Sequence, residues 1–173
     1  MQHGSPYGTH RVLEPIGVLP QGAWRIDNSM AIYDNEILID VAALNIDAAS
    51  FTQIKQEAAG DLARIASTVL GIVERRGKHH NPVTGSGGML IGRIAQIGPA
   101  LAGKVDLRVG DRIATLVSLS LTPLQIKTIG KVHLDKDQIE VEAQAILFAT
   151  GLYAKLPDDI PEKVALAVLD VAG

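Results

Sequence analysis

Two adjacent histidines, His79 and His80, are the side chains of this chain best suited to proton transfer. Histidine changes charge near neutral pH, so either ring can act as a general base. Neighbouring residues of an extended loop point in opposite directions, so at most one ring is expected to face a site. His80 is the better candidate because it lies nearer Asn81-Pro82, where the chain turns toward a glycine-rich bend. The alternative is a pair of solvated histidines behind a basic helix end.

Other loops carry carboxylate, hydroxyl and guanidinium groups. Asp47 can pair with an ammonium group or cap a helix, and the residues alone favour neither interpretation. For Ser50 a helix cap is favoured. Thr84 and Ser86 provide hydroxyls at the glycine-rich bend. Arg11 can hold a carboxylate through two parallel hydrogen bonds, with a surface turn as the alternative.

Two classes of site are weakly supported or excluded. The chain has no cysteine, which excludes disulfides, thiolate zinc sites, iron–sulfur clusters and cysteine nucleophiles. Gly85, Gly87, Gly88 and Gly92 do not have the G-x-G-x-x-G spacing, and they lead into a strand rather than a helix. We therefore expect no metal-binding and no cofactor-binding residues in this chain.

The composition is that of one globular domain. Of the 173 residues, 47% are hydrophobic and 20% charged, which is enough apolar material for a core. The net charge of −3 argues against nucleic-acid binding. There is no signal-peptide pattern and no apolar run near the ~20 residues of a membrane helix, so we expect no membrane association and a cytoplasmic location.

Apolar periodicity predicts mainly β structure with α, an α+β fold. Residues 36–44 alternate, which predicts a strand with Ile37, Ile39 and Val41 in the core. Residues 48–76 change to three- and four-residue steps, which predicts a helical segment broken near Gly60 and ended by Gly77. Further strands are predicted at residues 90–97, 112–119, 131–134, 138–141, 143–148 and 152–156.

The two ends of the chain differ. Residues 1–24 are rich in glycine and proline, which predicts an extended segment. Residues 157–161 carry a helix-start signal, and the residues that follow are apolar on nearly all sides. Such a helix must be buried, so we expect either a partner or a continuation of the chain.

Three ordered segments carry a family resemblance. The run GRIAQIG begins at Gly92, GDRI begins at Gly110, and AKLPD begins at Ala154. This order resembles the GroES-like catalytic domain of the medium-chain dehydrogenase/reductase superfamily. The resemblance implies a distorted β-barrel over residues 25–156 with one long helical segment. It also implies a linker and first helix at residues 157–173, leading to a Rossmann domain that is missing after Gly173, so that the chain is a fragment.

Longer runs, among them YGTHRVLEP, RGKHHNPVTGSGGMLIG and ILFATGLYAKLPDD, are similar to an amino-acid dehydrogenase family of bacterial lysine fermentation. The similarity extends over essentially all 173 residues. It implies NAD-dependent oxidative deamination of L-erythro-3,5-diaminohexanoate to 5-amino-3-oxohexanoate, with NAD bound mainly by the missing domain. The implied partners are a small amino-acid substrate and further copies of the chain in a homo-oligomer.

The resemblance departs from the zinc-dependent members. Gly87-Gly88-Met89 stands where those enzymes have Gly-His-Glu, and Asn45-Ile46-Asp47 occupies the loop of their cysteine ligand. The implied mechanism is zinc-independent. Proton transfer then falls to His80, His79 or Asp47, and the implied substrate-binding residues are Arg11, Ser50, Thr84 and Ser86. The alternatives are a zinc-less quinone or enoyl reductase, and a non-catalytic β-barrel binding module.

Overall fold

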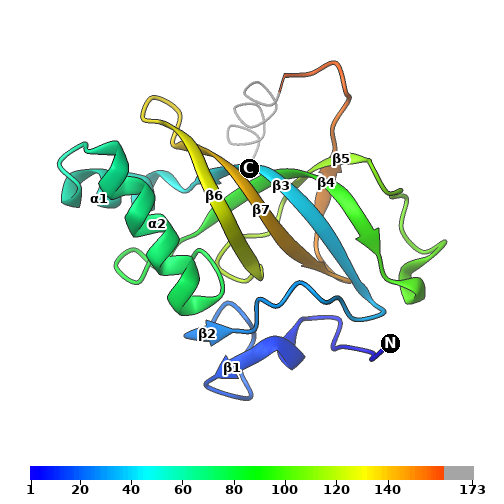
Figure 1. Cartoon of the computed structure of the whole chain (residues 1–173). Helices are drawn as coiled ribbons and strands as arrows, with labels where there is room; N and C mark the ends of the chain where they lie inside the picture. Colours follow the sequence, from blue (N-terminus) through cyan, green and yellow to red (C-terminus); the bar gives the residue numbers. More distant parts are fainter. Residues whose placement is uncertain (162–173) are drawn as a thin grey trace.

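Alternating apolar residues build one six-stranded antiparallel sheet in the computed structural model, which describes residues 1–161 (Figure 1). The sheet order is β6-β7-β3-β4-β5-β8, so β3 lies near its centre between β7 and β4. The strands are β3 (Glu36–Ile46), β4 (Gly88–Ile97), β5 (Arg112–Thr115), β6 (Leu124–His133), β7 (Gln138–Phe148) and β8 (Tyr153–Lys155). The predicted class, a mainly β, barrel-like α+β fold, is confirmed.

The helical segment is two helices, α1 (Ala48–Glu57) and α2 (Leu62–Arg76). The predicted break is confirmed: Ala59 and Gly60 have positive φ angles, and the Asp61 side chain accepts a hydrogen bond from the Arg64 N–H. Gly77 ends α2 at φ 72°, and a Cβ at this position would lie 2.1 Å from the Ile26 carbonyl oxygen. The predicted helix end is therefore required by both conformation and space.

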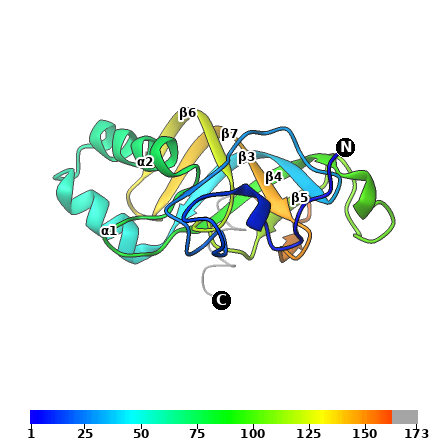
Figure 2. The same cartoon turned by 90° about the horizontal axis from the view of Figure 1, so that it is seen from below.

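Both helices lie at one end of the sheet, with α2 alongside β6 (Figures 1 and 2). Their apolar faces enter the main core through Phe51, Ile54, Ile65 and Val69, all at most 1% exposed. Each buried side chain of this size contributes roughly 1.5–3 kcal/mol. This packing holds the N-terminus of α1 at the end of β3.

Two strand predictions differ from the structure. The separate strands expected at 138–141 and 143–148 are one strand, β7, because a register shift opposite Val41 and Ala43 interrupts the alternation without ending the pairing. The strand expected at 112–119 ends at Thr115, and residues 118–122 fold into a tight turn. Gly92 allows a close approach of β4 to β3, since a Cβ there would lie 2.4 Å from the Asp40 carbonyl oxygen.

The N-terminal residues form a small layer below the main sheet (Figure 1). β1 (Val12–Glu14) pairs with β2 (Arg25–Ile26) in a separate two-stranded sheet. The division expected at residue 24 therefore falls inside one hairpin. The pairing and packing of this hairpin include residues on both sides of that boundary.

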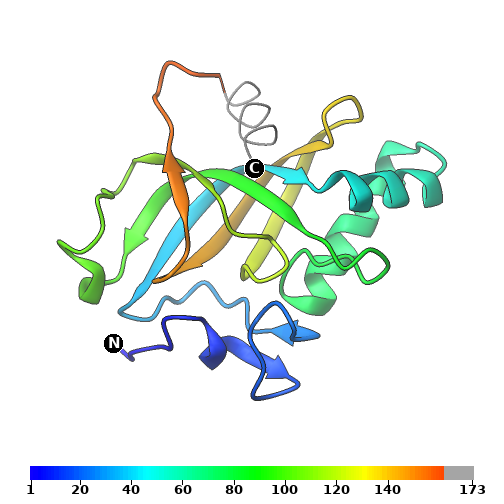
Figure 3. The same ribbon diagram turned by 180° about the vertical axis from the view of Figure 1, so that it is seen from behind.

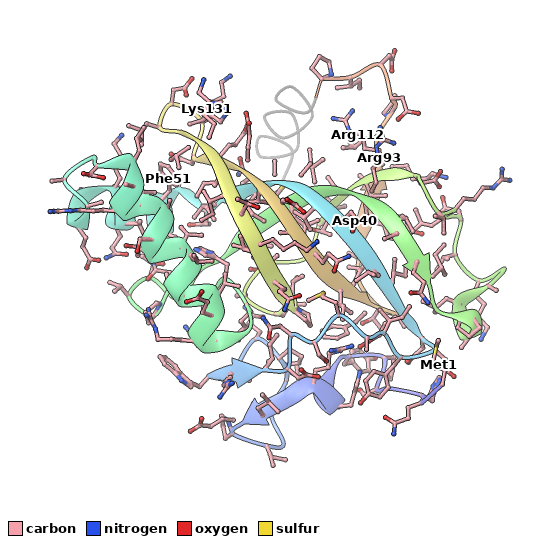
Figure 4. The ribbon with its side chains drawn as sticks, in the orientation of Figure 1. Met1, Asp40, Phe51, Arg93, Arg112 and Lys131 are labelled. Carbon is pink, nitrogen blue, oxygen red and sulfur yellow. The ribbon has the colours of Figure 1, made fainter. Side chains whose placement is uncertain are left out.

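Two neighbouring arginines hold the last described residues. Arg93 and Arg112 pair across β4 and β5 and lie close together in Figure 4. Arg112 donates to the carbonyls of Pro157 and Ile160, and Arg93 donates to Asp158. The helix expected after residue 161, and its buried apolar surface, lie outside the described residues. Within residues 1–161 no helix is long and apolar enough to cross a membrane.

Candidate functional site

The ends of β3, β4 and β5 meet at one groove of about 370 Å³. The loop before β4 and the loop after β5 lie side by side there, and the Leu119 N–H donates to the Gly88 carbonyl (Figure 3). Among residues 1–161, no lysine, arginine or histidine lines the groove. Its polar side chains are Gln21, Asn45, Asp47, Ser86, Ser118 and Ser120.

Asp47 both caps α1 and lines this groove. Its Oδ1 accepts hydrogen bonds from the Ala49 N–H at 3.0 Å and from the Ser86 hydroxyl at 3.1 Å. The side chain is exposed, and its backbone N–H donates to the Gly87 carbonyl. The helix-cap interpretation is confirmed, and it leaves the carboxylate on the groove wall. Binding of an ammonium group by Asp47 stays a prediction.

Three hydroxyl groups form a cluster beside Asp47. Ser50 Oγ lies 2.6 Å from Ser86 Oγ and 2.7 Å from Thr84 Oγ1, and the last two are 3.0 Å apart. Ser50 is completely buried within α1, so the cap predicted for it is wrong: Asp47 occupies the N-cap three residues earlier. Only Ser86 lines the groove, and the other two hydroxyls hold it in place.

His79 lies in the interior rather than in the groove. The side chain is 0% exposed, and neither ring nitrogen has a partner of hydrogen-bond geometry within residues 1–161. Burial lowers the pKa of His79 to about 4; the neighbouring Gly87 carbonyl opposes this shift without reversing it. A neutral, enclosed imidazole with so low a pKa does not fit the predicted base near neutrality.

His80 is bound at both ring nitrogens. Nε2 lies 3.1 Å from the Gly85 carbonyl oxygen and Nδ1 lies 3.2 Å from the Arg76 guanidinium, so Nε2 carries the proton. Burial, then Lys78 and Arg76, lower the pKa of His80 to about 4. His79 is buried, and His80 is half-buried with both ring nitrogens bound, so neither ring fits the predicted base well. A role for either histidine in proton transfer stays a prediction.

Lys78 is a buried lysine that the sequence did not single out. Its side chain is 0% exposed, and Nζ donates to the carbonyls of Pro20 and Gln21. Burial, then Arg76, lower the pKa of Lys78 to about 7. Through these bonds Lys78 ties the N-terminal segment to the end of α2 and holds Gln21 at the groove. A lysine after a helix end usually signals solvent, so no sequence signal revealed it.

Arg11 does clamp a carboxylate, but it is that of Glu36 in the same chain. The guanidinium is completely buried and binds Glu36 through two hydrogen bonds of 2.7 Å. Its other N–H groups donate to Asp27, Ser29 and Ala31. Burial raises the pKa of Glu36, but Arg11 and the Tyr33 N–H outweigh it and hold the pKa below its usual value. Substrate binding by Arg11 does not fit this arrangement.

The groove does not fit a zinc site of the type described above. A Cβ at Gly88 would lie 2.0 Å from the Asn45 carbonyl oxygen, so no ligand side chain fits at this position. Within the described part of the chain no three His, Cys, Asp or Glu side chains gather as a metal site. The glycines at residues 85–88 run into β4 and not into a helix, so they do not form a dinucleotide-binding turn.

Ser118 and Ser120 line the groove, although neither was given an individual role among the candidate site residues. They follow β5 in the turn that replaces the predicted end of that strand. A serine in a predicted strand is an ordinary surface residue, so its type carried no signal. Only the approach of this turn to Gly87 places both residues in the groove.

Comparison with known proteins gives consistent results. Residues 10–157 match the family model described as the L-erythro-3,5-diaminohexanoate dehydrogenase N-terminal domain. The chain is 63% identical over 170 residues to the L-erythro-3,5-diaminohexanoate dehydrogenase of Acetoanaerobium sticklandii, covering 98% of the chain and 49% of that protein. It is 60% identical over 173 residues to the protein of that name from Fusobacterium nucleatum, covering 100% of the chain and 50% of the relative. The chain spans about half the length of these curated relatives.

Proposed function

Because the chain belongs to the L-erythro-3,5-diaminohexanoate dehydrogenase N-terminal domain family, we propose that it is the substrate-side part of a dehydrogenase. The proposed reaction is oxidative deamination of L-erythro-3,5-diaminohexanoate to 5-amino-3-oxohexanoate, with NAD as the oxidant. The observation that carries the assignment to this site is the groove, in which an exposed carboxylate stands among neutral polar groups.

Asp47 is the proposed proton acceptor. The C3 ammonium group must lose a proton before its nitrogen lone pair can assist oxidation of the carbon that bears it. A carboxylate fixed by Ala49 and Ser86 can bind the ammonium group and take up that proton. Once the carbon has been oxidised and the carboxylate has passed its proton to solvent, the same carboxylate can deprotonate a water molecule for attack on the imine carbon. Protonation of the nitrogen in the resulting carbinolamine then lets ammonia leave and the ketone form.

The cofactor belongs to a part of the enzyme other than the described residues. We propose that a Rossmann domain binds NAD beside the groove and that residues 25–156 are GroES-like. Zinc independence is proposed from the donor set, since Gly88 has no room for a ligand side chain. A homo-oligomer in the cytoplasm remains our expectation for the whole protein.

The test is a chimera of this chain with the remaining half of the Acetoanaerobium sticklandii relative. We expect it to form NADH and ammonia from 3,5-diaminohexanoate, and to keep its rate after exhaustive chelation. Asp47→Asn is expected to lower kcat by about 10²–10⁴, the usual range for a general base. His79→Asn and His80→Asn should retain the base's pH profile.

The relative's own full-length protein is the control for assay and folding. A folded chimera that is inactive on this substrate but reduces a quinone or an enoyl compound would support the reductase alternative. A chimera inactive on all of them would favour the binding module. If either histidine variant loses the pH dependence of the rate and Asp47→Asn keeps it, the general base is that histidine and not Asp47.

A further inference from the structure

The Ser118 hydroxyl is held as a hydrogen-bond donor in the groove. Its Oγ accepts two hydrogen bonds, from the Ser120 N–H at 3.1 Å and from the Ser120 hydroxyl at 2.8 Å. A serine hydroxyl has one proton and two lone pairs, so both acceptor positions are used. No acceptor for the Ser118 proton is present among residues 1–161. The half-buried side chain lines the groove, where this proton is available to a ligand.

The turn that carries Ser118 is tightly bonded. The Ser118 carbonyl accepts from the Leu121 N–H and from the Thr122 hydroxyl, and the Leu119 N–H donates to Gly88. Ser120, which supplies both hydrogen bonds to Ser118, is only 1% exposed. The hydroxyl is therefore preorganised, and a ligand that accepts its proton loses little affinity to ordering of the turn.

Gly87 keeps the approach to Ser118 open. A Cβ at Gly87 would lie 2.8 Å from Ser118 Oγ and 2.5 Å from the Ser120 nitrogen. On the other side, Ser86 donates to Asp47. The two-residue segment Ser86-Gly87 therefore lies between the Asp47 carboxylate and the Ser118 hydroxyl donor.

The two groups select different parts of an amino acid. Ammonium groups only donate hydrogen bonds, so they cannot bind a hydroxyl whose lone pairs are both occupied. A carboxylate only accepts, so it pairs with the Ser118 proton and is repelled by Asp47. Of the polar groups on a diamino acid, only the carboxylate suits Ser118, and only an ammonium group suits Asp47.

We propose that Ser118 binds the substrate carboxylate while Asp47 binds the ammonium group, so that the groove accepts a β-amino acid in one orientation. The identity of the substrate rests on the proposed function above, but recognition of the zwitterion rests on the groove alone. The Ser118 residue is thus a determinant of specificity for amino acids over simple amines.

Binding to the 173-residue chain tests this by NMR titration of backbone amides. The probes are 3-aminobutanoate and 2-aminobutane, which share an amine but differ in the carboxylate. Ser118→Ala is expected to weaken 3-aminobutanoate binding by about tenfold, the loss of roughly one hydrogen bond to a charged group. It should change 2-aminobutane binding less than about twofold. Ser118→Thr, which keeps a hydroxyl, should restore most of the loss, and Ser67→Ala on the exposed face of α2 is the matched control.

Several results would overturn the proposal. One is an equal loss of affinity for both probes in Ser118→Ala, and another is no loss of affinity for either probe. A third is the absence of amide chemical-shift changes near Gly87 and Ser118 when the parent chain is titrated. Failure of the proposed function looks different: the chimera would be inactive while the probe selectivity remained. Conversely, an active chimera whose KM for 3,5-diaminohexanoate is unchanged by Ser118→Ala would reject this inference alone.

Discussion

Replacing Arg11 by methionine should lower the free energy of unfolding of this chain substantially. It should leave the chemistry of the groove unchanged. Arg11 is 0% and Glu36 1% exposed, and two 2.7 Å hydrogen bonds join them. Methionine keeps much of the side-chain volume but leaves the Glu36 carboxylate buried without its main partner. Breaking one side of such a pair costs about 3–5 kcal/mol.

Urea denaturation followed by circular dichroism measures the loss in free energy of unfolding. In thermal unfolding, a loss of 3–5 kcal/mol lowers the Tm of a domain of this size by about 6–20 °C. The matched control is Arg93→Met, since Arg93 is 55% exposed and its partner Asp158 80% exposed. Such a surface pair contributes about 0–1 kcal/mol.

The comparison separates a structural Arg11 from a substrate-binding one. If Arg11→Met is within about 1 kcal/mol of Arg93→Met, the buried pair does not stabilise the fold as argued. If stability is retained and the chimera's KM rises, Arg11 binds the substrate carboxylate and the Ser118 inference loses its ground. The double variant Arg11→Met/Glu36→Leu should recover part of the loss, because no buried charge then remains.

Three further predictions concern pH and backbone space. The pKa of His79 is about 4 in the folded chain and 6.5 in the unfolded chain, so the unfolded chain binds more protons between these pH values. Stability therefore falls as the pH drops from 6.5 to 4. In urea titrations at several pH values, His79→Leu should remove up to about 3 kcal/mol of this pH dependence. The pKa of Lys78 is about 7 against 10.5, so stability should rise with pH across that window, and Lys78→Met should flatten the rise. Gly88→Ala should cost about 1–3 kcal/mol or more, since its Cβ would lie 2.0 Å from a carbonyl oxygen, whereas Gly103→Ala, which meets no atom within 4 Å, should cost less by thermal unfolding. Each prediction fails if the variant matches the parent chain.

Local elements were predictable because their signals are local. The break at Gly60 and the end at Gly77 depend on residues within one helical turn, and both are confirmed. The strand that became β3 was equally clear, because alternation on a half-buried sheet is a pattern of neighbouring residues.

The continuity of β7 was not predictable in the same way. Its alternation is interrupted where β3 shifts register, so the sequence reads as two short strands. Pairing with β3 and β6 on either side keeps the backbone hydrogen-bonded across the interruption. The length of that strand is decided by neighbours distant in sequence.

The candidate site divides along the same line. Sequence alone identified Asp47 and Ser86, because each stands at the end of an element whose limits are set locally. Burial decided the rest: Arg11, Lys78 and His79 have polar side chains that normally indicate solvent, yet each is 0% exposed. Whether such a group reaches solvent, a core or a groove depends on what packs over it, and that is determined by the tertiary structure. Ser118 entered the site for this reason, through the approach of its turn to Gly87.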